Sequence, residues 1–277
     1  MTEGARVQRR PEPPEPSRDV VTVLDVPITN LSQEAAVALI RRWVAARAGC
    51  SRSVFIANAH TLNLASEHPG YREILRHADV VFGDGSGVRL AARLRGVRMC
   101  ANLVGTDLVP RLMAESLSDG VRYYLLGAGA DTIGRAVRSL EERIPGIAIA
   151  GFHHGFLDAT NSREVVERIN AARPDVLLVA MGNPLQEEWI ARHQPQLRVP
   201  VSIGVGGLFD HWAGNLVRAP RWVRRAGFEW LQILLQQPRK KWRRYVLGNP
   251  KFIARTLVTT RKERAGLAAG ARHGLPD

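Results

Sequence analysis

From Val20 onward, short apolar runs alternate with longer amphipathic stretches. Strands are predicted over the runs VVTVLDVPI (a strand or one arm of a hairpin), SVFIAN, DVVFGDG, VRYYLLGAG, GIAIAGF, DVLLVAMG and VPVSIGVGG. Helices are predicted between them, over 32–47, 61–77, 86–95, 105–117, 131–143, 161–172 and 184–193. This alternation is typical of a Rossmann-like α/β fold, in which helices cover both faces of a mostly parallel sheet.

The predicted strands end in polar or glycine-rich phrases. These phrases are Asn58, Gly83-Asp84-Gly85, Gly127-Ala128-Gly129, His153-His154-Gly155, Gly182-Asn183-Pro184 and Gly204-Val205-Gly206-Gly207. Ligands of open α/β sheets bind outside the carboxyl ends of the strands. We therefore expect these phrases to build one ligand-binding rim.

Two side chains of this rim have both a chemical and a structural interpretation. Asp84 follows a buried strand between two glycines, which allow a tight turn and the close approach of a ligand. It is a candidate general base, and equally a candidate cap for the helix that begins near Ser86. Gln186 is a candidate hydrogen-bonding group for a base or sugar, whereas the acids beside it are explained by helix capping.

Other motifs argue against common cofactors. LLGAGADTIG resembles a dinucleotide fingerprint, but its third glycine, Gly134, comes two residues late, and no acid ends the next strand. A phosphate or nucleoside cradle at Gly127 and Gly129 is the alternative. His153 and His154 are adjacent on an extended segment and point to opposite faces, so they do not predict a metal pair. The chain also has no Asp-x-Asp motif, and we expect a metal-independent mechanism without a cofactor.

Charge divides the chain. The net charge is +13, and residues 216–264 contribute +12 of it, with only Glu229 and Glu263 as acids. We expect a proline-rich disordered tail over 1–19, a nearly neutral body over 20–215, a basic and aromatic helical appendage over 216–264, and a flexible tail over 265–277. The appendage predicts an interfacial amphipathic helix on an anionic membrane, a basic helix on nucleic acid, or a packed helix with solvated arginines.

Composition excludes several classes of protein. The two cysteines, Cys50 and Cys100, are too few for a disulfide scaffold or a multi-cysteine zinc site. No apolar run approaches the roughly 20 residues that a membrane-spanning helix needs, and the polar N-terminus does not resemble a signal peptide. A soluble or peripheral protein of the cytoplasm is expected.

Taken together, the motifs resemble those of the WecG/TagA/CpsF family of bacterial glycosyltransferases (glycosyltransferase family 26). The resemblance covers residues 21–258 and is carried by NAHTLNLA, ADVVFGDGSGVRLAARLRG, LVGTDLVPRL, YYLLGAG, GFHHGF, RPDVLLVAMGNPLQEEWI and IGVGGLFDHWAGNLVRAPRWVRRAGFEWLQILLQQPRKKWRRYVLGNPKF. It implies an inverting, metal-independent transferase that moves a sugar from a UDP-sugar to a saccharide on undecaprenyl pyrophosphate. It also implies that Asp84 is the base, that Asn58 lines its pocket, and that the appendage targets the membrane and helps to close the site.

The resemblance and the rim together predict the substrate contacts. The expected contact residues are Asn58, Gly85, Asn102, Gly127, Gly129, Gln186, Gly206, Gly207, Asp210, Arg218 and Arg221. Helix N-termini and an arginine such as Arg218 or Arg221 would stabilise the departing UDP. Many family members have threonine at the position of Ile56 and arginine at that of Asn102, so a hexose other than N-acetylmannosamine is an alternative donor sugar.

The expected partners are a UDP-sugar, a polyprenyl-pyrophosphate-linked saccharide and the anionic cytoplasmic face of the bacterial membrane. No nucleic acid is expected, and a homo-oligomer is left open. Two rival functions each account for part of the sequence. A nucleic-acid-binding protein with a Rossmann-like body accounts for the charge but leaves the glycine-rich rim unused. An NAD-dependent oxidoreductase is weakened by the displaced glycine and the missing acid.

Overall fold

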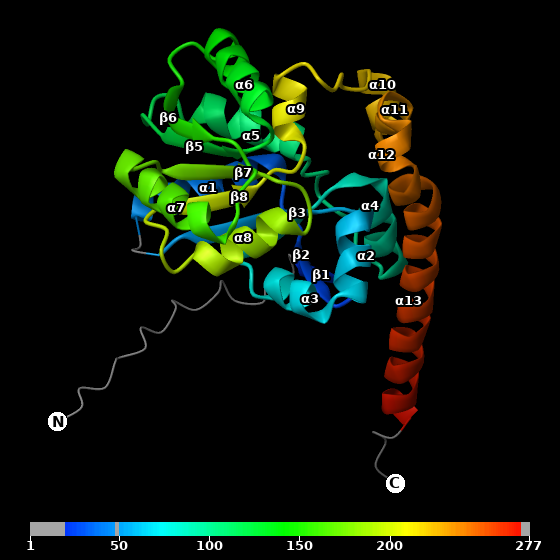
Figure 1. The fold of residues 1–277 in the computed structure, drawn as a ribbon. Coiled ribbons are helices and arrows are strands. Elements are labelled where there is room, and N and C mark those ends of the chain that lie inside the picture. Colours follow the sequence, from blue (N-terminus) through cyan, green and yellow to red (C-terminus); the bar gives the residue numbers. More distant parts are fainter. Residues whose placement is uncertain (1–19, 48–49, 273–277) are drawn as a thin grey trace, which may run out of the picture.

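The computed structural model describes residues 20–47 and 50–272 of the 277-residue chain (Figure 1). The tail expected over 1–19 lies outside the described residues, as do residues 273–277 of the tail expected over 265–277.

The described strands form one eight-stranded sheet with the order β1-β2-β4-β3-β8-β7-β5-β6. They are β1 (Val20–Val23), β2 (Val26–Thr29), β3 (Arg52–Ala57), β4 (Val80–Gly83), β5 (Arg122–Gly127), β6 (Ala148–His153), β7 (Val176–Ala180) and β8 (Val201–Gly204). β1 runs antiparallel to β2, and the other pairings among these strands are parallel. The mostly parallel sheet predicted from the sequence is confirmed.

Helices cover both faces of this sheet, as predicted. One face packs against α1 (Gln33–Ala46), α5 (Gly105–Glu115), α6 (Ala130–Arg143) and α9 (Leu208–Trp212). The other face packs against α2 (Ala59–Glu67), α3 (Pro69–Arg76), α4 (Gly85–Leu94), α7 (Ala159–Ala172) and α8 (Leu185–His193). The strands are buried on both sides, which explains why they are continuous apolar runs in the sequence.

Two local features differ in detail from the predicted elements. The first run is a complete hairpin, because Leu24 (φ 48°) and Asp25 (φ 63°) adopt the left-handed backbone of a tight two-residue turn. The prediction of a single helix over 61–77 is wrong. This segment forms two helices, α2 and α3, which are separated at His68. The extended backbone of His68 (φ −122°, ψ 97°) is the conformation that Pro69 imposes on the residue before it.

The basic C-terminal segment is not one amphipathic helix but a series of helices. They are α10 (Arg221–Arg225), α11 (Glu229–Gln236), α12 (Pro238–Trp242), the π-helical turn η1 (Arg243–Leu247) and α13 (Gly248–Arg272). Gly227 (φ +82°) follows the end of α10, and Pro238 starts a new helix after α11. The boundary expected at residue 264 falls inside α13. We keep the name appendage for residues 216–264.

The appendage is docked on the body. In Figure 1, α13 lies beside α2 and α4, and its C-terminal part extends past them. The Phe252 side chain is 1% exposed and belongs to the core cluster under α2 and α4. Polar contacts fix the same interface. The Asn63 side-chain amide donates to the Gly248 carbonyl at 2.8 Å, and Arg255 pairs with Glu67 at 2.8 Å.

Candidate active site

Asp84 lies at the carboxyl end of β4, where α4 begins. Its backbone N–H donates to the Ala57 carbonyl at 2.8 Å, which ties the turn to the end of the neighbouring strand β3. Asp84 occupies the position that caps α4, but its carboxylate accepts no capping hydrogen bond. The carboxylate therefore has no part in closing the helix end.

Asn102 performs the capping instead. Its side-chain oxygen accepts a hydrogen bond from the Gly85 backbone N–H at 2.6 Å, and the next residue, Leu103, donates from its backbone to the Gly83 carbonyl at 3.1 Å. The interpretation of Asp84 as the cap of α4 is therefore not supported, because Asn102 makes the capping hydrogen bond.

Asn58 brings a second polar group to Asp84. It caps α2, and its side-chain oxygen accepts from the backbone N–H groups of His60 at 3.0 Å and Thr61 at 3.3 Å. With its oxygen engaged, its amide nitrogen is the group left to donate, and the Asn58 side chain hydrogen-bonds to Asp84. Two strand-end phrases predicted to share a rim are therefore in contact.

Opposing effects set the protonation of Asp84. The pKa of the Asp84 carboxyl is raised from its usual 3.8 to about 6, because the increase caused by burial and by the negative charge of Glu229 outweighs the decrease caused by its other neighbours. The positive charges of Arg244 and Arg218 and the hydrogen bond from Asn58 lower it. The carboxyl is thus mostly ionised at pH 7 yet a stronger base than an ordinary aspartate, as a general base requires.

The appendage supplies positive charge to the same rim. Two nitrogens of the Arg218 guanidinium donate to the two carboxylate oxygens of Asp107, at 2.5 and 2.6 Å, and Arg218 Nε lies 3.5 Å from Glu229 Oε1. Arg224 Nη1 lies 3.6 Å from Asp107 Oδ1. Burial raises the pKa of Asp107, but Arg218 outweighs this effect and lowers it overall. Arg221 is exposed at the start of α10 and makes no recorded polar contact with this cluster in the described chain.

The glycine-rich turns lie along the carboxyl edge as predicted. Gly127 (φ +144°) follows β5, and a Cβ at this position would collide with the Ala180 carbonyl, so only glycine fits. Gly129 precedes α6, and a Cβ there would meet the Phe156 ring at 3.7 Å. Phe156 is 76% exposed and forms part of the rim beside these glycines.

Gln186 is buried and supports one of these turns. Its amide oxygen accepts from the Gly206 N–H at 2.9 Å, and its nitrogen donates to Glu187 at 2.7 Å. Gly207 follows Gly206 and precedes α9. These contacts make Gln186 a support for the β8 turn, which is a structural interpretation the sequence did not suggest.

Asp210 is held by the segment that leads to the appendage. Its carboxylate accepts from the Asn215 side chain at 3.0 Å, and Asn215 also donates to Thr132 at 3.2 Å in the first turn of α6. Asn215 thus links Asp210 of α9 to α6, at the edge of the sheet where the glycine-rich turns lie.

Glu187 is a buried acid that the sequence interpretation assigned to helix capping. Its Oε1 accepts from Asn183 at 2.6 Å and from Gln186 at 2.7 Å. Its Oε2 has no hydrogen-bond partner of normal geometry among the described residues, although the Tyr71 hydroxyl lies close enough to influence it. Burial raises the pKa of Glu187 to about 7.

His153, the last residue of β6, and His154 lie beside each other. Their ring centroids are 4.3 Å apart, and His153 Nδ1 lies 2.8 Å from the His154 carbonyl oxygen. Within the described residues, no group of three or more metal-binding side chains comes together.

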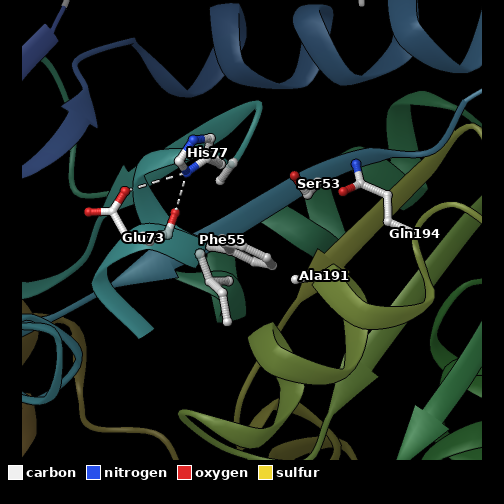
Figure 2. Close-up of a pocket in the computed structure, with 8 residues that line it drawn as sticks. Ser53, Phe55, Glu73, His77, Ala191 and Gln194 are labelled. Carbon is white, nitrogen blue, oxygen red and sulfur yellow. Dashed lines mark hydrogen bonds and ion pairs between the residues drawn. The ribbon is translucent and has the colours of Figure 1, made fainter. Parts of the chain in front are cut away.

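A separate hollow of about 440 Å³ lies between α3 and α8. Figure 2 shows its lining, with Ser53, Phe55, Glu73, His77, Ala191 and Gln194. Ser53 belongs to the amino-terminal half of β3, whereas Asp84 and the glycine-rich turns lie at the carboxyl edge. This hollow is therefore distinct from the candidate site.

Sequence reasoning missed the contributions of Asp107, Glu229 and Arg244 to the site. The signal for Glu229 was present, because it is one of two acids in the strongly basic appendage. Asp107 is unremarkable in the sequence, as an acid in the first turn of a helix is normally explained by the helix dipole.

A mostly parallel sheet with helices on both faces places this protein in the Rossmann-like α/β class, with its candidate site at the carboxyl edge of the sheet. The chain belongs to the glycosyl transferase WecG/TagA/CpsF family, whose sequence model matches residues 21–266, and it is a glycosyltransferase.

Two relatives are enzymes called N-acetylglucosaminyldiphosphoundecaprenol N-acetyl-beta-D-mannosaminyltransferase. One, from Bacillus spizizenii, is 34% identical over 193 residues, which cover 70% of this chain and 74% of the relative. The other, from Staphylococcus aureus strain NCTC 8325, is 31% identical over 211 residues, or 76% of this chain and 82% of the relative. Among the described residues, every helix falls short of the length and apolar character that crossing a membrane requires.

Proposed function

We propose that this chain is an inverting, metal-independent transferase. It moves a hexose or N-acetylhexosamine from a UDP-sugar to a saccharide linked to undecaprenyl pyrophosphate. The names of the two relatives support this acceptor class. The product would enter a cell-surface polysaccharide such as an exopolysaccharide, a teichoic acid or an enterobacterial-antigen-like polymer.

The observation that carries the proposal is that the Asp84 carboxylate makes no helix-capping hydrogen bond and is contacted by the Asn58 side chain. Because Asn102 caps α4, the Asp84 carboxylate is available to take the proton of an acceptor hydroxyl. The acceptor oxygen then attacks the anomeric carbon from the face opposite the UDP, which inverts that centre as the bond to UDP breaks. A raised pKa makes Asp84 a better proton acceptor while leaving it ionised near neutral pH.

The leaving UDP needs a positive counter-charge in such a mechanism. Arg218 is the best candidate, because its guanidinium binds the two carboxylate oxygens of Asp107 through two nitrogens. Two oxygens of a diphosphate can accept hydrogen bonds from a guanidinium in the same bidentate way. The N-terminus of α6, after Gly129, is a second favourable position for phosphate. The absence of an Asp-x-Asp motif supports metal independence.

The donor sugar is constrained by Ile56. This side chain is 9% exposed, two residues before Asn58, and its Cδ1 would lie 3.3 Å from a Cβ built on Gly105. An apolar group there offers no hydrogen bond to a sugar substituent, which supports a donor other than N-acetylmannosamine.

The appendage is proposed to hold the enzyme on the anionic cytoplasmic face of the membrane. Its exposed side chains include Trp222 (73%), Leu235 (73%), Leu247 (56%) and Val246 (53%), amid basic residues. Aromatic and apolar groups enter the interface while Lys and Arg meet anionic headgroups. In this arrangement, 20–215 is the catalytic body and 216–264 is the membrane-binding appendage.

The decisive experiment measures UDP release. Purified protein is incubated with a panel of UDP-sugars and a short-chain pyrophosphate-linked glycolipid, with and without EDTA. Release from one donor, unaffected by EDTA and dependent on the acceptor, supports the proposal and identifies the sugar. If no donor gives release, thermal stabilisation by UDP separates a wrong acceptor from a wrong proposal.

A further inference from the structure

Glu229 lies in the first turn of α11, close to where the appendage contacts the turn that carries Asp84. The Gly227 carbonyl accepts from the Ser86 hydroxyl at 3.4 Å, and a Cβ on Gly227 would lie 3.2 Å from Ser86 Cβ. Ser86 is two residues after Asp84 and Glu229 is two residues after Gly227, so this contact places the two acids on neighbouring segments. Trp230 packs against Tyr245 with ring centroids 5.9 Å apart, which fixes the start of α11 on η1.

An acid in the first turn of a helix has an ordinary explanation, because it favours the positive end of the helix dipole. The helix dipole does not account for the other contacts of Glu229. Its carboxylate pairs with Arg218 at 3.5 Å, and Arg218 in turn holds Asp107 of the body. Burial lowers the pKa of His211 and raises that of Tyr245, and the negative charge of Glu229 acts on both groups in the raising direction. Glu229 therefore lies near titratable groups of α9 and η1.

We propose that Glu229 is a positioning residue of the transfer site, whose carboxylate orients the Arg218 guanidinium at the rim and places a negative charge near Asp84. The inference rests on the proposed function, because it takes Asp84 as the base. The proposal gives the appendage a role in the reaction through an acidic residue, which the strong positive charge of the appendage does not suggest.

The polar and charged groups that face Asp84 come from both parts of the chain. The body contributes Asn58, whose hydrogen bond lowers the pKa of Asp84. The appendage contributes Glu229, which raises that pKa, and Arg244 and Arg218, which lower it. Burial raises the pKa of Tyr245, and the negative charge of Asp84 adds to this increase. Burial remains the largest influence on the pKa of Asp84. A displaced appendage that exposed Asp84 to solvent would therefore lower this pKa, whichever residue had been changed.

Glu229 and Arg244 change the pKa of Asp84 in opposite directions, so the direction of the change in each variant separates a local charge effect from loss of the appendage. The pKa of Asp84 is measured in the full-length protein by NMR of ¹³C-labelled aspartate carboxyls, with Asp84→Asn used to assign the resonance. In Glu229→Gln we expect the titration midpoint to fall by roughly 0.5–1.5 pH units, from Coulomb's law at an intermediate dielectric. In Arg244→Gln we expect it to rise.

Glu263→Gln is the matched control. It removes the other acid of the appendage, which pairs with Arg95 at 3.1 Å on the far part of α13, and it should leave the midpoint unchanged. Glu229→Asp keeps the charge and should restore most of the shift. An unchanged midpoint in Glu229→Gln overturns the proposal. A fall in both Glu229→Gln and Arg244→Gln means that the appendage has come away, and it also overturns the proposal, because Glu229 would then serve only in docking.

The kinetic counterpart is the pH profile of UDP release. In Glu229→Gln its acid limb should move to lower pH together with the NMR midpoint, and the plateau rate should fall because Arg218 loses a partner. A wild-type protein that releases no UDP from any donor counts against the proposed function, whereas the NMR titration still decides the relation between Glu229 and Asp84.

Discussion

The Asn102 side chain accepts a hydrogen bond from the Gly85 N–H at 2.6 Å, beside the carboxylate that would otherwise cap that helix. This division of labour separates the structural requirement of α4 from the chemistry of Asp84. A cap and a base at one position would conflict, because a carboxylate that accepts helix N–H groups has a lowered pKa and is a poor proton acceptor.

The first prediction concerns the base itself. Asp84→Asn should lower turnover by about 10²–10⁴-fold, the usual contribution of a general base, while the affinity for UDP changes little because the fold and Arg218 are retained. UDP release and UDP titration calorimetry measure the two quantities. Asp119→Asn, which removes a surface partner of Arg41, is the control and should behave as wild type. Unchanged turnover in Asp84→Asn would exclude Asp84 as the base.

The second prediction is a pH dependence. Because the pKa of Asp84 is raised to about 6 and the base must be ionised, kcat/KM should rise with pH through about 6 and level off above it. A rate that is flat from pH 5 to pH 8 would contradict this assignment. Changing the buffer ions at fixed pH controls for ionic effects.

The third prediction tests the Asn102 cap. Asn102→Ala should reduce the free energy of unfolding by about 1 kcal/mol, the typical value of a lost N-cap, and should also lower turnover because the turn at Asp84 is no longer fixed. Urea unfolding at pH 7 measures the first effect. Asn102→Asp retains an acceptor for the Gly85 N–H and should recover the stability. Equal stability of Asn102→Ala and wild type would show that the cap contributes nothing.

The fourth prediction uses the buried acid Glu187. Its pKa in the folded protein, about 7, is above the usual 4.5, so folding favours the protonated form and stability falls as the pH rises toward and through 7. Glu187→Gln removes this loss and preserves the two hydrogen bonds that Oε1 accepts from Asn183 and Gln186. Its new amide can donate toward Tyr71.

Urea unfolding of Glu187→Gln should therefore show greater stability than wild type at pH 8, by about 3 kcal/mol from the linkage relation, and little difference at pH 4. A variant that is less stable than wild type at pH 8 would mean that the ionised carboxylate is needed. Glu188→Gln, on the same helix but outside this network, provides the control.

The fifth prediction concerns membrane binding. The double variant Trp222→Ser, Trp242→Ser should lose most of its affinity for vesicles that contain phosphatidylglycerol, because two exposed interfacial aromatic side chains (73% and 44%) are removed. Sedimentation with vesicles measures this. Phe156→Ser removes an equally exposed aromatic ring (76%) from the body and should bind as wild type. If the double variant sediments as well as wild type, the appendage acts otherwise.

Much of this architecture follows from local sequence patterns. Apolar runs such as DVLLVAMG predict buried parallel strands, and their polar ends predict that Asn58 and Asp84 meet at one edge, which the structure confirms. The division of α2 from α3 was missed because apolar periodicity was given more weight than Pro69.

The relations between distant segments could not be predicted. Asn102 was placed in the site by resemblance, but its contact with Gly85 depends on how the chain between β4 and α5 returns to the turn. Glu229 reaches the neighbourhood of Asp84 from 145 positions along the chain, through the docking of Gly227 on Ser86. No local periodicity encodes such a meeting, because it depends on the packing of the whole appendage.

The buried position of Phe252 has a consequence for the order in which the enzyme matures. Its ring fills the space beside Gly87 and Ala59, at the starts of the two helices that follow Asp84 and Asn58. The eight strands of the described residues all precede Phe252 in the chain, so the body can be assembled during synthesis before this ring is available. The nascent protein would then hold Asp84, the proposed base, on a turn that Phe252 does not yet support. Catalytic competence would be acquired late, when α13 arrives.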